Sequence, residues 1–144
     1  MDLPQRFNSV AAAVAASALV LITGCGNPAA MNESSPNVKH ITQMEYGDEV
    51  TRYSQPVVVD FYATWCGPCR QLSPLLDRVA GGYSGKIKFV KVNVDESPGL
   101  AQNYQVQAIP AVLLFKAGKL VDRIDGLPTE TDLKTKLDAL ASAR

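Results

Sequence analysis

The chain has 144 residues, which is enough for about one domain of ordinary size. Its 14 lysines and arginines balance its 14 aspartates and glutamates, so it lacks the basic surplus that favours binding to nucleic acid or anionic lipid by charge. The 3 cysteines are too few for a scaffold held by many disulfides. They occupy two places, Cys25 alone and Cys66 with Cys69, and these need separate explanations.

The N-terminal residues 1–24 predict an export signal. The apolar run from Val10 to Ile22 is shorter than the roughly 20 residues that cross a bilayer, but it suits the apolar core of a secretory signal, about 7–15 residues. Residues 21–25, Leu-Ile-Thr-Gly-Cys, resemble the bacterial lipoprotein signal. That resemblance implies cleavage before Cys25 and its lipidation as a membrane anchor. An ordinary secretory signal that leaves Cys25 free is the alternative.

Residues 25–37 are small, polar or proline residues without periodicity, a composition typical of a flexible tether. Together with a lipidated Cys25 they would hold the rest of the chain close to a membrane. Residues 38–144 form the predicted single domain.

Short β-branched runs predict strands within that domain, at 57–62, 87–94 and 111–115. The first and third runs are almost wholly apolar, which is typical of strands covered on both faces in the middle of a sheet. Residues 116–119 contain a glycine and predict a turn into a further strand at 120–124.

Helical spacing of leucines predicts helices at 69–83 and 129–141. Gly81, Gly82 and Gly85 would stop the first of them. Strands that alternate with helices and end in a hairpin indicate an α/β fold, a mixed β-sheet flanked by helices.

The sequence Cys66-Gly67-Pro68-Cys69 lies where an apolar strand gives way to a helix. Residues three apart on a helical turn have Cβ atoms about 5–6 Å apart, close to the spacing that a disulfide requires. The helix N-terminus stabilises a thiolate there, so the N-terminal cysteine, Cys66, is expected to be the more exposed and nucleophilic one. Pro68 suits the first turn, where no backbone donor is needed.

Two other interpretations of the pair are weaker. A structural zinc site needs four ligands, and the chain offers only His40 and Cys25 in addition. A static structural disulfide would close a very short loop, which stabilises a fold least in the chain-entropy model. The pattern therefore favours a redox-active pair with no metal.

Residues 38–144 resemble the thioredoxin family. The resemblance rests on 58–69, which include Trp65 and both cysteines, on 91–95, and on Ile109-Pro110 followed by 111–116. It implies a three-layer sandwich with a mixed sheet, and no cofactor beyond a Cys66–Cys69 disulfide. In that chemistry Cys66 attacks a substrate disulfide and Cys69 resolves the mixed disulfide.

The same resemblance assigns a base and its partner. Asp60 follows three valines, so burial would raise its pKa and suit it to accept the Cys69 proton. Lys91 corresponds to the lysine that the family places near this carboxylate. A capped or solvated strand end is the alternative for Asp60, and a solvated strand face for Lys91.

Pro110 resembles the family's cis-proline, which lies opposite the cysteines. It would present the backbone of Ile109 for strand-like pairing with a substrate peptide. The expected substrate groove around Cys66 consists of Trp65, Gly67, Pro68, Ile109, Pro110, Gly126 and Leu127. Ordinary packing is the alternative for Trp65 and Ile109.

Taken together, the sequence predicts a monomeric, membrane-tethered thiol:disulfide oxidoreductase of the cell envelope, on the periplasmic or extracellular side of a bacterial membrane. It would reduce protein disulfides and be recharged by a membrane electron donor, because exported compartments are oxidising. A disulfide-donating or isomerising enzyme and a thioredoxin-like binding or chaperone scaffold are the alternatives.

Overall fold

The computed structural model describes residues 35–142. The predicted signal at 1–24, Cys25 and most of the predicted tether lie outside these residues. The last part of the predicted tether, residues 35–37, is described and contacts the domain. Asn37 N donates to Asp77 Oδ1 at 3.1 Å, and Ser35 Oγ donates to the same carboxylate. Among the described helices, none has the length and apolar character needed to cross a membrane.

A single five-stranded sheet organises the domain, in the order β1-β3-β2-β4-β5. β1 pairs with β3 in parallel, as does β2, whereas β2 with β4 and β4 with β5 are antiparallel. The predicted mixed sheet is therefore confirmed, with the two most apolar strands inside it. The strands are β1 (Lys39–His40), β2 (Val57–Tyr62), β3 (Lys88–Asn93), β4 (Ala111–Lys116) and β5 (Lys119–Asp125).

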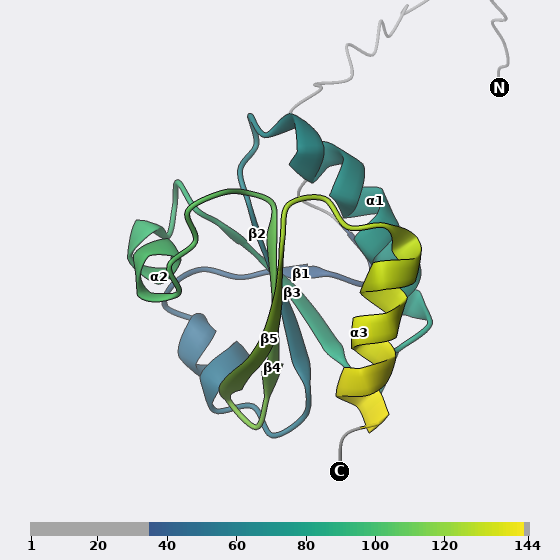
Figure 1. Cartoon of the computed structure of the whole chain (residues 1–144). Coiled ribbons are helices and arrows are strands. Elements are labelled where there is room, and N and C mark those ends of the chain that lie inside the picture. Colours follow the sequence, from purple (N-terminus) through teal and green to yellow (C-terminus); the bar gives the residue numbers. More distant parts are fainter. Residues whose placement is uncertain (1–34, 143–144) are drawn as a thin grey trace, which may run out of the picture.

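Helices cover both faces of the sheet and complete three layers (Figure 1). α1 (Gly67–Gly81) and α3 (Glu130–Ser142) lie on one face, and α2 (Pro98–Asn103) lies on the other with the π-helical turn η2 (Gly47–Thr51). The predicted α/β sandwich is thus confirmed. The sequence patterns missed α2 and η2, which are too short to show a helical period.

Two hydrophobic clusters follow from the alternation of side chains along each strand. Val58 of β2 packs with Leu72 and Leu76 of α1 and with the leucines of α3. Val57, Val59 and Phe61 face the opposite side, where they pack with residues of η2 and α2. All six residues of β2 are buried, because it is the central strand and has helices on both sides.

The hairpin between β4 and β5 turns at Ala117 and Gly118, whose φ angles are 48° and 75°. A Cβ on Gly118 would lie 2.9 Å from the carbonyl carbon of Thr51 and would collide with its oxygen. This turn therefore requires glycine for both its conformation and its close approach to η2.

We expect Gly118→Ala to destabilise the fold by more than about 2 kcal/mol, because left-handed backbone strain and a backbone collision add. Gly85→Ala is the matched control, since Gly85 has a φ of 76° and, chain neighbours aside, no atom of the described residues lies within 4 Å of the added Cβ. It should lose only about 1–2 kcal/mol. Urea denaturation of both variants measures the difference, and equal losses would contradict the collision.

Candidate active site

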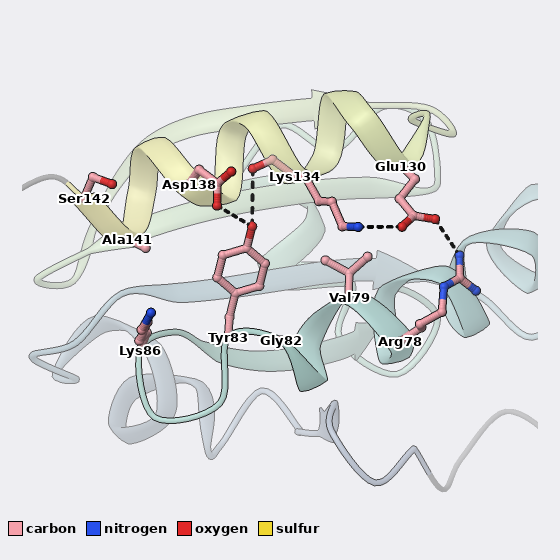
Figure 2. Close-up of a pocket in the computed structure, with 10 residues that line it drawn as sticks. All are labelled: Arg78, Val79, Gly82, Tyr83, Lys86, Glu130, Lys134, Asp138, Ala141 and Ser142. Carbon is pink, nitrogen blue, oxygen red and sulfur yellow. Dashed lines mark hydrogen bonds and ion pairs between the residues drawn. The ribbon is translucent and has the colours of Figure 1, made fainter.

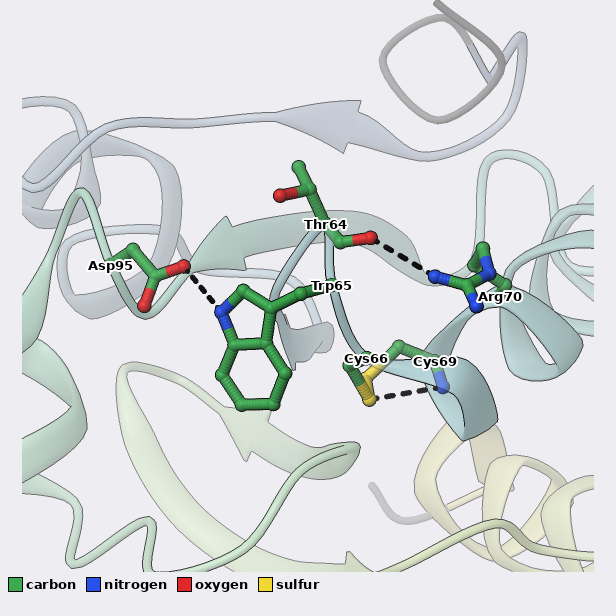
Figure 3. The surroundings of a disulfide bond; sticks show 6 residues. All are labelled: Thr64, Trp65, Cys66, Cys69, Arg70 and Asp95. Atoms are coloured by element: carbon green, nitrogen blue, oxygen red, sulfur yellow. Dashed lines mark hydrogen bonds between the residues drawn. A yellow bond between two sulfur atoms is a disulfide. The ribbon is translucent and has the colours of Figure 1, made fainter. Parts of the chain in front are cut away.

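The end of β2 and the start of α1 build a redox pair. Cys66 is the N-cap of α1, and its Sγ accepts a hydrogen bond from Cys69 N at 3.2 Å. Pro68 lies in the first turn, where backbone N–H groups have no intrahelical partner, so the lack of an N–H costs no hydrogen bond. Cys66 and Cys69 are joined as a disulfide, with their Cα atoms 5.3 Å apart (Figure 3).

Both sulfur-bearing residues are largely covered. Cys66 is 4% exposed and Cys69 is 1% exposed. The more exposed of the two is therefore Cys66, as expected for the attacking cysteine, although its exposed area is small. They form a cluster with Tyr62 and Ala63, against which Ile109 packs. A substrate therefore reaches Cys66 at the surface of this cluster, and Cys69 lies behind it.

Trp65 flanks the disulfide and is 67% exposed. Its Nε1 donates to Asp95 Oδ2 at 2.9 Å, which holds the indole beside the cysteines (Figure 3). On the other side, Arg70 Nη1 donates to the carbonyl oxygen of Thr64 at 3.2 Å. The predicted roles of the site residues did not include Asp95 or Arg70. A signal existed for Asp95, since it follows β3 at the sheet edge where β2 also ends.

Asp60 and Lys91 are brought together in the interior. They are partners in the parallel ladder between β2 and β3, and each is 3% exposed. The alternatives of a solvated strand end and a solvated strand face are therefore wrong: both residues lie on central strands beneath a helical layer. The Lys91 ammonium also lies over the ring of Tyr62, 5.3 Å from its centre.

Burial determines the protonation of Asp60. Loss of hydration raises the pKa of this carboxyl to about 7, against the opposing attraction of Lys91. Its Oδ1 is buried and has no hydrogen-bond partner among the described residues. A carboxyl that titrates near neutral pH can both accept and return a proton under ordinary conditions.

The alternation of β2 places Asp60 under the start of α1. Val58, Asp60 and Tyr62 lie on one face of the strand. Val58 packs with Leu72 of α1, and Tyr62 packs with Cys66 and Cys69. Asp60 lies between these two, on the face that α1 covers, so the structure brings it to the side of the site where Cys69 is buried.

A second chain segment approaches the disulfide from the β4 side. The Ile109–Pro110 bond is cis, as the family resemblance implied, and Pro110 O accepts a hydrogen bond from Gly126 N at 2.8 Å. Leu127, next to Gly126, is 45% exposed. The structure thus gathers the predicted substrate-binding residues of the 109–110 and 126–127 segments at one place.

Gly67 leaves its side of the helix start open. A Cβ on Gly67 would meet only an Arg70 nitrogen, at 3.9 Å, within the described part of the chain. No internal contact therefore requires glycine here, and the space is available to a partner. The expectation that Gly67 allows another backbone to approach remains a prediction about a substrate.

A separate groove of about 620 Å³ lies between α1 and α3 (Figure 2). Glu130 binds both Arg78 and Lys134 at 2.7 Å, and Tyr83 Oη donates to Asp138 at 2.6 Å. Most of its charges are thus paired within the groove. None of the predicted site residues lines it, and the chemistry lies at the disulfide instead.

Within residues 35–142, no three or more histidine, cysteine, aspartate or glutamate side chains gather as metal ligands. The two sulfurs are bonded to each other as a disulfide. The redox group is the chain's own disulfide.

The thioredoxin family model matches residues 37–139. "Thioredoxin 1" of Synechococcus elongatus is 44% identical over 98 residues, which cover 68% of this chain and 92% of that protein. "Thioredoxin" of Pyropia yezoensis is 40% identical over 106 residues, 74% of this chain and 99% of the relative. "Thioredoxin M2, chloroplastic" of Arabidopsis thaliana is 40% identical over 106 residues, covering 74% of this chain and 57% of that protein.

These matches span nearly all of the described sheet and helices, including both cysteines. Proteins of this kind exchange electrons through a pair of cysteines without a bound cofactor. This chain belongs to the thioredoxin family and is a thiol:disulfide oxidoreductase.

Proposed function

We propose that this protein is a membrane-tethered reductase of protein disulfides that acts outside the cytoplasm. The observation that carries the reductase part is the Cys66–Cys69 disulfide, set between the exposed Trp65 and the Ile109–Pro110 segment. An exposed indole and an extended backbone segment beside the sulfurs suit a peptide substrate, which supplies apolar side chains and unpaired backbone groups.

The reaction proceeds in two exchange steps. In the reduced protein, the Cys66 thiolate attacks one sulfur of a substrate disulfide, and the other substrate sulfur leaves as a thiolate. The Cys69 thiol then gives its proton to the Asp60 carboxylate and attacks Cys66 Sγ. The second substrate sulfur leaves as a thiolate, both substrate thiolates take up protons to give the reduced dithiol, and the protein, oxidised by two electrons, now carries the Cys66–Cys69 disulfide.

Local structure supports the role of Cys66 as the attacking sulfur. The Cys69 N–H points at Cys66 Sγ, and the positive end of the α1 dipole lies there too. Both favour negative charge on this sulfur. Cys69 lies deeper, and no donor to its sulfur is found among the described residues, so it depends on a base such as Asp60.

The direction of electron flow follows from the residues between the cysteines. The Gly67-Pro68 dipeptide resembles the one between the cysteines of the reducing members of the family, whereas oxidants and isomerases usually carry other residues there. A reductase in an oxidising compartment consumes its dithiol at each turnover. We therefore include a membrane electron donor that restores the Cys66 and Cys69 thiols.

The reduction potential tests this direction. We expect a value near −270 mV, typical of thioredoxins, when the protein is equilibrated with glutathione buffers and its thiols are counted by alkylation. A value near the −120 mV of a strong disulfide donor would contradict reduction and favour the oxidising alternative. Cys25→Ala is the background for this measurement, because it leaves only the redox pair to be alkylated.

Lipidation of Cys25 tests the tether. In a bacterial host, we expect the full chain to incorporate a labelled fatty-acid analogue and to fractionate with membranes. Cys25→Ala should abolish incorporation and release the protein. Cys66→Ser is the matched control, since it also removes one cysteine but should be labelled normally. Labelling that survives Cys25→Ala would overturn the proposed anchor.

A further inference from the structure

The segment from Tyr104 to Pro110 carries Ile109 to the disulfide. Tyr104 and Val106 pack against the hydrophobic core and Ile109 packs against the cysteine cluster, whereas Gln107 and Ala108 between them are exposed. It is fixed at its start, where Val106 N donates to Ala101 O at 2.8 Å, and at its end, where Pro110 O binds Gly126 N. In the described part of the chain, Gln107, Ala108 and Ile109 make no backbone hydrogen bond. The position of the Ile109 backbone thus depends on how the two ends are held.

Arg123 of β5 spans this region. Its Nη1 donates to the carbonyl oxygen of Tyr104 at 3.2 Å, while its Nε and Nη2 donate to the Asp125 carboxylate at 3.1 and 2.6 Å. Arg123 and Asp125 are two apart on a strand and therefore point to the same face. A planar guanidinium bound on both sides has a fixed orientation.

Arg123 bridges a pocket beside the segment. A pocket of about 450 Å³ separates the segment from the end of β5, and it is lined by Gln105, Gln107, Ala108, Arg123 and Asp125. These side chains are polar or small, so on this side Gln107 and Ala108 gain little apolar packing, and the apolar contacts of the segment come from Tyr104, Val106 and Ile109. The guanidinium bridges the space that packing does not fill.

We propose that Arg123 is a positioning residue for protein substrates, which holds the Ile109 backbone in the conformation that pairs with an extended peptide. This inference rests on the proposed reduction of protein disulfides. It assigns the two attachments of the segment to one strand: Arg123 holds its start, and Gly126, directly after Asp125, holds its end.

Arg123 acts on substrate binding and not on the chemistry of the sulfurs. Within the described residues Arg123 has no hydrogen bond to either cysteine or to Asp60, and the Cys66–Cys69 turn is built where β2 ends and α1 begins, without β5. A small disulfide such as glutathione disulfide needs no strand pairing. A protein disulfide must order the loosened segment on binding, which costs about 1–2 kcal/mol for each backbone residue fixed.

Single-turnover reduction of insulin by the prereduced protein tests the role, with glutathione disulfide as the small substrate. We expect Arg123→Ala to raise the half-saturating insulin concentration about tenfold, with the limiting rate and the glutathione disulfide rate within twofold of wild type. Arg123→Lys keeps the charge but can reach fewer acceptors, so it should fall between the two. Lys136→Ala is the control, because Lys136 pairs with Asp122, whose side chain lies on the face of β5 opposite to that of Arg123.

Amide hydrogen exchange gives a readout that is independent of substrate. We expect exchange at Val106 and Gly126, whose amides form the hydrogen bonds at the two ends of the segment, to be faster in Arg123→Ala but unchanged in Lys136→Ala. Unchanged exchange, an unchanged half-saturating concentration, or an equal loss with both disulfides would overturn the positioning role. Wild-type protein that fails to reduce insulin would instead refute the proposed function, and the exchange result would still decide whether Arg123 holds the segment.

Discussion

Replacing Cys66 by serine is expected to abolish insulin reduction, with a loss of more than about 10³-fold in rate. Serine is nearly the same size, so the fold around Tyr62 and Ala63 should be retained. Its hydroxyl cannot form a disulfide, and without the attacking sulfur no mixed disulfide arises. Turbidity from precipitating insulin chains, with dithiothreitol as the electron source, measures this loss.

Cys69→Ser distinguishes attack from resolution. This variant keeps the Cys66 sulfur but lacks the thiol that releases the substrate, so it should accumulate mixed disulfides that dissociate on treatment with excess dithiol. Incubation of Cys69→Ser with insulin or with envelope extract, followed by non-reducing electrophoresis, would display them. Residual turnover in Cys66→Ser, or trapping by Cys66→Ser rather than Cys69→Ser, would contradict the assigned roles.

Asp60→Asn should stabilise the protein at alkaline pH. The native carboxyl titrates near pH 7, whereas an unfolded one titrates near 3.9. Between these values the native state keeps a proton that the unfolded state has lost, so this group makes the folding stability fall as pH rises from about 4 to about 7. The full penalty, at most about 4 kcal/mol, is present above pH 7.

Urea denaturation from pH 4 to pH 8 measures this effect. The stability gained by Asp60→Asn should be small at pH 4 and reach a few kcal/mol at pH 8. Asp48→Asn is the control, because the Asp48 carboxyl is 74% exposed and pairs with Arg52 on the surface. A gain that does not change with pH would show that Asp60 is not the buried titrating group.

The same substitution should slow the second exchange step by about 10²-fold, because Cys69 loses its base. The decay of a preformed mixed disulfide on Cys66 measures this step directly. In the wild type, its rate should rise with pH through about 7 as Asp60 ionises. Asp60→Asn should lose that rise, while the first attack by Cys66 remains within a few-fold of wild type.

Sequence patterns succeeded where one segment carries the whole signal. The apolar run of β2 predicted its bounds, Val57–Tyr62, because a central strand must be apolar on both faces. The leucine spacing located α1 and α3 to within about two residues, since each buries one stripe. Short elements escaped detection: α2 and η2 contain too few residues for any period to emerge.

Contacts between distant segments were not predicted, for a different reason. The bond from Trp65 to Asp95 and the bridge from Arg123 to Tyr104 join residues from separate elements, and no local pattern encodes such a meeting. The family resemblance suggested that Asp60 and Lys91 were partners, but the register of β2 on β3 was needed to place them side by side and buried.

The kind of chemistry could be predicted without a structure, because the spacing of Cys66 and Cys69 at the start of a helix is a local property of the chain. The surroundings of that pair depend on the folded chain: the burial of Asp60 beside Lys91, the bond that holds the Trp65 indole beside the sulfurs, and the way the Ile109 segment is held. Burial and strand register are collective results of packing the sheet against its helices, and they exist only once the chain has folded.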